Sequence, residues 1–330
     1  MESLLGFGVK HQAGLGGSPT GGMLVKIVFM GTPDFAVPSL EALINSDYKV
    51  VGVFTQPDKK RGRGYELSLP PVKKTADKYH IAVFQPQTLK NDEAYEKLLE
   101  LQPDLIIVVA YGKILPENVL KLPKLGCINV HGSLLPEYRG AAPIQWAVID
   151  GKEKTGITTM YMDKGLDTGD MLLKEEVTID PNETSGELYD RLSKIGANLL
   201  IKTLNGLDSG TIKREKQDDA KATYAKILTK DLSLIDWNKN AFDIHNLVRG
   251  LNPWPVASTV LDSKTLKIYK TKLANAIASK PGIVLNESPF VVSCGNNTAI
   301  EILELQMENK KRMQSDAFLR GYKIKNINLS

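Results

Sequence analysis

Two apolar runs, LIIVVAYG at residues 105–112 and CINVH at residues 127–131, decide the fold class of this 330-residue chain. Each run is almost continuous in valine, isoleucine and other apolar residues, which is typical of a strand buried on both faces of a parallel sheet. Strand and helix patterns alternate outward from these runs. Strands are expected at residues 24–30, 49–56 and 81–86, and helices near residues 37–45, 72–79 and 92–101. This alternation predicts an α/β domain with a mostly parallel sheet covered by helices.

The pattern changes after residue 150. GITTMYMD (156–163) and MLLKEEVTID (171–180) have the composition of two strands, and the turn-rich KGLDTG between them permits an antiparallel hairpin. A helix is expected from Thr184 to about Asn205, because Thr184 and Glu187 form a capping-box pattern ahead of an apolar stripe. Short alternating segments then favour a small C-terminal β barrel or sandwich.

Four segments follow from these patterns. Residues 1–22 end in a Gly/Ser/Pro-rich tract and are expected to be a leader or a flexible extension. A catalytic domain is expected over residues 23–212, a charged linker over residues 213–228, and a small β domain over residues 229–330.

Composition excludes several classes of protein. No apolar run reaches the roughly 18 residues of a membrane helix. The two cysteines, Cys127 and Cys294, have no metal-ligand spacing, so a metal-free protein of a reducing cytoplasm is expected. The net charge is +4, and the surplus lies in residues 231–330, which hold 13 Lys and Arg against 9 Asp and Glu. This surplus points weakly to a polyanionic partner.

The chemistry-bearing residues gather where the second apolar run ends. Side chains alternate along a strand, so Asn129 and His131 project to the same face. An amide and an imidazole together can stabilise a negatively charged oxygen that develops on an attacked carbonyl. The carboxyl ends of parallel strands are also where ligands bind in α/β sheets. A site for acyl-type transfer is therefore expected here.

A carboxylate beside His131 would orient the imidazole and help it to move protons. Asp163, Asp167 and Asp170 are all candidates, and sequence spacing does not rank them. No GxSxG motif and no cysteine beside a base is present, so direct transfer between two bound substrates is expected instead of a covalent intermediate.

Two further segments resemble binding loops. The stretch SLLPEYRGAAPIQWAV (133–148) is expected to wrap a pocket for a flat heterocycle. The loop DKKRGRG (58–64) holds Lys59, Lys60, Arg61 and Arg63, a set that could grip nucleic-acid phosphates. GTPDF (31–35) has one glycine where a dinucleotide fingerprint needs three, which disfavours a nicotinamide cofactor.

These segments together resemble the methionyl-tRNA formyltransferase family. The resemblance runs from about Lys26 to Gly321, and NVHGSLLPEYRGAAPIQWAV, TQPDKKRGRG, GITTMYMDKGLDTGDML and VRGLNPWP are the motifs that carry it. It implies a formyltransferase-type Rossmann-like domain followed by a C-terminal barrel of the OB type. It also implies transfer of the formyl group of 10-formyltetrahydrofolate, the co-substrate, to the amino group of methionyl-initiator tRNA in translation initiation.

The resemblance also implies roles for residues. The catalytic trio would be Asn129, His131 and Asp167, and the folate-contacting segment would be Ser133, Leu134, Leu135 and Pro136. The tRNA would be contacted by Lys59, Lys60, Arg61 and Arg63. This chain departs from the family by having Tyr65 and Glu66 where a second basic pair is common. A monomer acting in the cytoplasm is expected.

Three alternatives remain open from the sequence. A related folate-dependent enzyme could formylate a small amine or hydrolyse formylfolate. A non-catalytic RNA-binding protein would use the basic loop and the C-terminal domain, although the presence of Asn129, His131 and Asp167 argues against it. An NAD-dependent oxidoreductase is disfavoured by the incomplete glycine pattern.

Overall fold

The computed structural model describes residues 25–61, 66–275, 279–324 and 327–329. The expected leader at residues 1–22 and the predicted tRNA contact Arg63 therefore lie outside the described residues. The chain divides into two compact units. The first contains the described residues up to His131, Thr158–Lys174 and Ser193–Gln217, and the second contains Gly132–Ile157, Glu175–Leu192 and the described residues from Asp218 onward.

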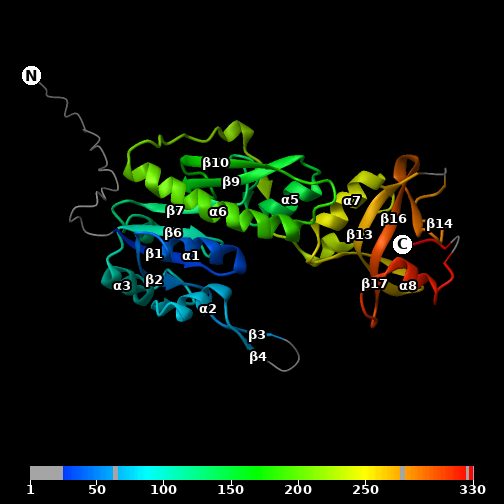
Figure 1. Ribbon diagram of the computed structural model, residues 1–330, viewed down its shortest axis with the longest axis horizontal. Coiled ribbons are helices and arrows are strands. Elements are labelled where there is room, and N and C mark those ends of the chain that lie inside the picture. Colours follow the sequence, from blue (N-terminus) through cyan, green and yellow to red (C-terminus); the bar gives the residue numbers. More distant parts are fainter. Residues whose placement is uncertain (1–24, 62–65, 276–278, 325–326, 330) are drawn as a thin grey trace, which may run out of the picture. The chain divides into compact units, whose positions relative to one another are not determined.

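A seven-stranded sheet is the main feature of the N-terminal part, with the strand order β10-β9-β7-β6-β1-β2-β5 (Figure 1). Neighbouring strands from β7 to β5 are parallel, and β9 is antiparallel to β7. The strands are β1 (Lys26–Gly31), β2 (Lys49–Phe54), β5 (Val83–Phe84), β6 (Leu105–Val109), β7 (Cys127–His131), β9 (Lys154–Tyr161) and β10 (Met171–Thr178). The expected α/β domain with a mostly parallel sheet is confirmed.

The two apolar runs form β6 and β7, and every residue of both strands is buried. β1 lies next to β6, and the chain adds β2 and β5 on one side of this pair and β7 on the other. The strand order therefore reverses between β1 and β6, which is where open α/β sheets bind ligands beyond their carboxyl ends. Gly31 ends β1 at this point, and a Cβ there would lie 2.8 Å from the Ala36 Cβ, so the tight strand-to-helix turn requires glycine.

The helices are mostly short, and the long α6 is the exception. They are α1 (Val37–Ile44), α2 (Pro71–Lys78), α3 (Asp92–Leu101), α4 (Glu117–Leu120), α5 (Pro143–Ile149), α6 (Ser185–Asp208), α7 (Ala241–Gly250) and α8 (Ser315–Leu319). The predicted capping box precedes α6: the Thr184 amide donates to Glu187 Oε2 at 2.8 Å, and the Glu187 amide donates back to Thr184 Oγ1 at 3.2 Å. These bonds satisfy amides that the first helical turn leaves unpaired.

The C-terminal part contains an antiparallel sheet of order β12-β13-β16-β15-β14, with β17 paired to β16. Its strands are β12 (Ala257–Leu261), β13 (Lys264–Ala274), β14 (Val284–Asn286), β15 (Val291–Cys294), β16 (Thr298–Met307) and β17 (Met313–Gln314). On β13, Leu266 and Ile268 are buried while Lys267, Lys270 and Lys272 are exposed. The expected C-terminal antiparallel β domain is confirmed.

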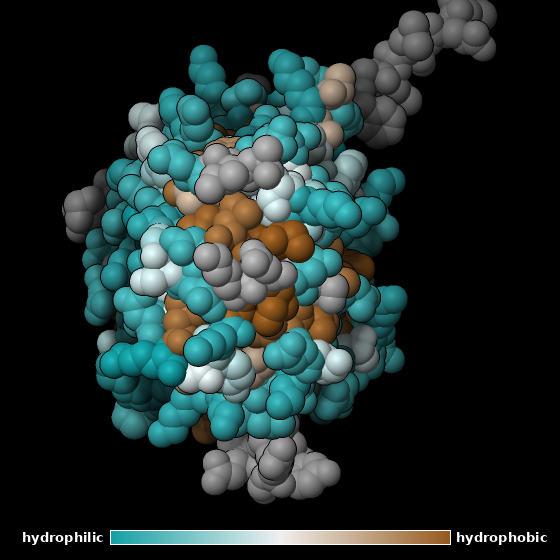
Figure 2. All heavy atoms as spheres, turned by 90° about the vertical axis from the view of Figure 1, so that its right-hand side faces the viewer, coloured by the Kyte–Doolittle hydropathy of each residue, from teal (hydrophilic) through white to brown (hydrophobic). Residues whose placement is uncertain are grey.

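The surface at this end of the chain is mixed. Figure 2 shows hydrophobic residues gathered in the middle of the face turned toward the viewer and hydrophilic residues around them. The core of the second unit includes Val248 of α7, Ile302 of β16, and Trp237 from the segment before α7. Within the described residues, no helix has both the length and the apolar character that crossing a bilayer demands.

Short pairings complete the fold. β8 (Arg139–Gly140) pairs in parallel with β11 (Tyr224–Ala225), and β3 (Lys59–Arg61) pairs with β4 (Glu66–Ser68). In the part of the chain that the structure describes, 3-10 helices lie at Asp34–Ala36, Asp219–Lys221, Lys230–Ser233 and Gly295–Asn297. The segment expected as a linker is therefore partly structured, because it contains β11 and one of the 3-10 helices.

Candidate active site

The strand β7 fixes two of the predicted site residues. Asn129 and His131 are two residues apart, so their side chains leave the same face of the strand. β7 lies between β6 and β9, with Asn129 opposite Met160 and His131 opposite Thr158 on β9. Asn129 is 9% exposed and His131 is 5% exposed. Both groups are therefore held on a rigid strand and largely removed from bulk water, which strengthens their interaction with a developing charge.

The carboxylate comes from the loop between β9 and β10. Asp167 Oδ2 lies 3.7 Å from His131 Nδ1. This distance is that of an ion pair rather than of a hydrogen bond, and such a pair forms only while the imidazole is protonated. The backbone φ of Asp167 is +53°, in the left-handed region that L-residues seldom adopt. The structure thus places Asp167 next to His131, and the backbone of Asp167 itself has the left-handed conformation.

The other two candidate aspartates have different contacts. Asp163 Oδ1 accepts hydrogen bonds from the Gly165 amide at 2.9 Å and from Thr168 Oγ1 at 2.6 Å. Asp163 therefore stabilises the turn through hydrogen bonds to other residues of the same loop. The backbone carbonyl of Asp170 accepts a hydrogen bond from the Tyr161 amide at 2.9 Å, which closes the loop against the end of β9.

One residue that sequence reasoning missed also holds this loop. Gln217 Nε2 donates to the Asp167 carbonyl at 2.7 Å and to the Gly169 carbonyl at 2.8 Å. Gln217 lies in the charged stretch KREKQDDAKAT, which carried no motif for a site, and 50 residues separate it from Asp167. No local sequence signal could have found this contact.

Hydrogen bonds join the loops that follow β1, β2 and β6 at the carboxyl edge of the sheet. Thr32 Oγ1 donates to the Tyr111 carbonyl at 3.0 Å, and Gln56 Nε2 donates to the carbonyls of Tyr111 and Gly112, each at 3.1 Å. Lys113 Nζ donates to the Gln87 carbonyl at 2.7 Å, and burial lowers the pKa of this lysine. These bonds make a preorganised rim at the end of the sheet where ligands bind.

The predicted folate segment, Ser133–Pro136, belongs to the second unit and is partly engaged in its own packing. Ser133 is fully buried, and its hydroxyl donates to the Glu137 carbonyl at 2.6 Å. Leu135 is buried, whereas Leu134 and Pro136 are half-buried. The peptide bond between Leu135 and Pro136 is cis.

The predicted basic loop contains a two-stranded ribbon (Figure 1). Lys59, Lys60 and Arg61 form β3, and in β4 Glu66 stands opposite Arg61. The sequence departure at Glu66 thus falls directly across from a predicted tRNA contact. Just before the ribbon, Asp58 accepts hydrogen bonds from Gln85 and Lys73, and these lower the pKa of its carboxyl. Lys59, in contrast, is exposed.

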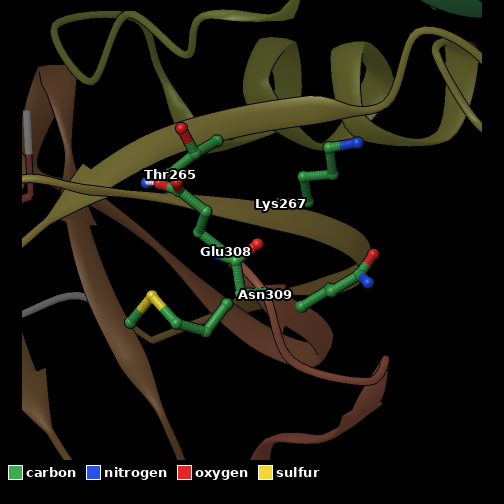
Figure 3. Close-up of a pocket in the computed structure, with 6 residues that line it drawn as sticks. Thr265, Lys267, Glu308 and Asn309 are labelled. Carbon is green, nitrogen blue, oxygen red and sulfur yellow. Dashed lines mark hydrogen bonds between the residues drawn. The ribbon is translucent and has the colours of Figure 1, made fainter.

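A pocket of about 270 Å³ lies elsewhere, on the C-terminal sheet (Figure 3). It is lined by Thr265, Lys267, Gln306, Met307, Glu308 and Asn309. None of these residues belongs to the predicted catalytic, folate or tRNA-loop sets. The chemistry-bearing residues are those at the end of β7.

Comparison with known proteins defines the class to which this fold and site belong. The family described as "Formyl transferase" matches residues 25–204, and the family described as "Formyl transferase, C-terminal domain" matches residues 227–323. An N-formyltransferase from Helicobacter canadensis, solved with folinic acid and dTDP-3-aminofucose, has a TM-score of 0.66 at 22% identity and covers 86% of this chain and 100% of its own. HypX from Aquifex aeolicus has a TM-score of 0.62 at 16% identity over 91% of this chain and 48% of its own. The class is that of the formyltransferases.

The sequence relatives narrow the class. The methionyl-tRNA formyltransferase of Clostridium novyi is 52% identical over 304 residues, which are 91% of this chain and 98% of that protein. That of Clostridium botulinum is 53% identical over 304 residues, or 91% of this chain and 97% of that protein. The chain belongs to the methionyl-tRNA formyltransferase family.

Proposed function

We propose that Asn129, His131 and Asp167 carry out direct transfer of a formyl group from 10-formyltetrahydrofolate to the α-amino group of methionyl-initiator tRNA. Membership of the family makes methionyl-tRNA the formyl acceptor and formyltetrahydrofolate the co-substrate. The single observation that supports the catalytic assignment is the approach of Asp167 to His131, at 3.7 Å, where β7 ends.

The reaction balances without a covalent enzyme intermediate. The methionyl amine attacks the formyl carbon, a new C–N bond forms, and a tetrahedral oxyanion results. The amide of Asn129 and the imidazole of His131 donate hydrogen bonds to this oxygen. The oxyanion collapses, the bond from the formyl carbon to N10 of the folate breaks, and the proton lost by the amine is matched by one gained at N10. His131 moves that proton while Asp167 stabilises the transient imidazolium.

Two binding roles complete the proposal. The segment Ser133–Pro136 contacts the folate through its backbone groups, since the hydroxyl of Ser133 already donates to the Glu137 carbonyl. Lys59, Lys60, Arg61 and Arg63 hold the phosphates of the tRNA acceptor end. We also propose domains at residues 23–212 and 229–330 joined by residues 213–228, and a monomer that works in the cytoplasm, where its tRNA substrate is made and used.

The test is formylation of methionyl-tRNA by purified wild-type protein and by Asn129→Ala, His131→Ala and Asp167→Ala. Loss of an oxyanion donor typically reduces turnover by about 10² to 10³. We expect each variant to lose at least 10²-fold in single-turnover rate while its thermal unfolding and tRNA affinity stay near the wild-type values. Near-normal single-turnover formylation by His131→Ala would refute the assignment.

A further inference from the structure

The β9–β10 loop, residues 162–170, carries the proposed catalytic carboxylate and is held against a segment from far along the chain. Residues 213–217 run beside the start of β10, where Met171 and Glu215 exchange two backbone hydrogen bonds of 2.8 and 2.9 Å. The Arg214 guanidinium also stacks over the Tyr161 ring at 3.8 Å from its centroid. The segment that presents Gln217 to the loop therefore contacts both flanking strands, by backbone hydrogen bonds to Met171 at the start of β10 and by the Arg214 side chain over Tyr161 at the end of β9.

Both of the hydrogen bonds from Gln217 to the loop come from one nitrogen. Nε2 reaches the carbonyls of Asp167 and Gly169, which are two residues apart. Two carbonyl oxygens can be satisfied only by the NH₂ group of the amide, so the orientation of the side chain follows from chemistry. The pair of bonds spans Thr168 and fixes the direction of the peptide on each side of it.

The hydrogen bonds from Gln217 hold the loop at two residues with unusual backbone constraints, Asp167 and Gly169. Asp167 has a left-handed φ of +53°, a conformation that persists in an L-residue only when surrounding contacts hold it. Gly169 lies so close to the Tyr161 carbonyl that a Cβ would stand 1.8 Å from that oxygen. The direction of the Asp167 side chain is set by this backbone conformation, and the 3.7 Å approach to His131 depends on that direction.

We infer that Gln217 is a positioning residue of the active site: its amide holds the loop so that the Asp167 carboxylate faces His131. Gln217 acts through Asp167, whose backbone carbonyl accepts one of its hydrogen bonds. The inference rests on the proposed function of the trio. A purely structural role, in which Gln217 only secures residues 213–217 to the β9–β10 loop, makes a different kinetic prediction.

A double-mutant cycle separates the two roles. Gln217→Met keeps the length and approximate shape of the side chain but has no donor. We expect it to reduce the single-turnover formylation rate about 10- to 100-fold, because misplacement by about 1 Å of a catalytic group can cost 10² in rate. The KM values for tRNA and formylfolate should stay within about twofold. In the Asp167→Ala background, Gln217→Met should cause no further loss, since the group that it positions is already absent.

Two more variants complete the design. Gln217→Asn keeps the amide but is one methylene shorter, so it should reach one carbonyl at most and lose an intermediate amount of rate; it keeps the inference testable if Gln217→Met folds poorly. Ser209→Ala is the matched control, because Ser209 Oγ also donates to two backbone carbonyls, those of Asn205 and Gly206, at the end of α6. It should leave the rate unchanged.

Each outcome decides something. Wild-type protein that formylates methionyl-tRNA, with Asp167→Ala impaired and both Gln217 variants normal, would overturn the role of Gln217 and leave the proposed function standing. A loss from Gln217→Met that multiplies with that of Asp167→Ala would show that Gln217 acts independently of Asp167, which also overturns the inference. Unimpaired formylation by Asp167→Ala would refute the catalytic role of Asp167 and the role of Gln217 with it, whereas no formylation by the wild-type protein would refute the proposed function.

Discussion

The charge of Asp167 can be removed with almost no change in shape, and Asp167→Asn is the sharpest test of the site. At 3.7 Å, and with an effective dielectric constant of about 20, the Coulomb attraction between a carboxylate and a full positive charge on His131 is about 4 to 5 kcal/mol before screening by water. Water at the partly exposed loop screens this attraction and the neutral amide dipole replaces part of it, so the net loss is smaller than the Coulomb energy. A loss of about 2 to 3 kcal/mol from the transition state corresponds to a rate reduction of roughly 30- to 150-fold.

The assay is single-turnover formylation of methionyl-tRNA with saturating formylfolate, so that the chemical step is measured. Asp163→Asn is the matched control: it makes the same chemical change four residues earlier, and the asparagine Oδ1 can still accept from the Gly165 amide and Thr168 Oγ1. We expect its rate to stay within threefold of wild type. Equal losses in the two variants would mean that the general negative charge of the loop matters, and not the approach of Asp167 to His131.

Three other predictions concern binding, reactivity and stability. Lys59→Ala should weaken tRNA binding and reduce the slope of log K against log salt by about 0.7 to 0.9, as measured by filter binding across salt concentrations; an unchanged slope would remove Lys59 from the tRNA contacts. Burial raises the pKa of the Cys127 and Cys294 thiols to about 12, so a thiol reagent at pH 8 should modify neither in the native protein and both after denaturation. Burial lowers the pKa of His245 below its ordinary 6.5. As the pH drops below about 6.5, the unfolded chain therefore binds a proton at this histidine more readily than the folded chain does, and the free energy of unfolding should fall. Denaturant titrations at pH 7 and pH 5 should show a smaller stability loss for His245→Gln than for wild type, with exposed His80→Gln behaving as wild type.

The parts of the fold that were predictable are those that depend on local patterns. β6 and β7 were predictable because strands buried on both faces need continuous apolar residues, and the helix start at α6 was predictable because a capping box is a contact over three residues. The pairing of β8 with β11 was not, since it joins residues 139–140 to residues 224–225 and neither segment has a strand pattern of its own. The β3–β4 ribbon was likewise missed, because glycines in DKKRGRG indicated only flexibility.

In the candidate site, too, local patterns predicted some residues, whereas contacts between distant segments determine others. Asn129 and His131 could be assigned to one face from strand alternation alone, because that periodicity is a property of the backbone. The residues themselves left Asp163, Asp167 and Asp170 unranked, and the family resemblance alone favoured Asp167. Which carboxylate meets His131 depends on the loop conformation, which Gln217 and the close approach of Gly169 to Tyr161 help to determine.

The site therefore combines two ways of fixing a side chain. Strand β7 holds Asn129 through backbone pairing with both β6 and β9, and it holds His131 through pairing with β9, so single substitutions around them should disturb their positions little. A loop holds Asp167 through a few side-chain hydrogen bonds, any one of which a single substitution can remove. We therefore expect variants that are distant from substrate but reduce the rate of the chemical step to cluster in residues 163–170 and 213–217. In the Asp167→Ala background, these variants should cause no further loss of rate. Distant variants on β6 or β9 that slowed chemistry equally, with or without Asp167, would contradict it.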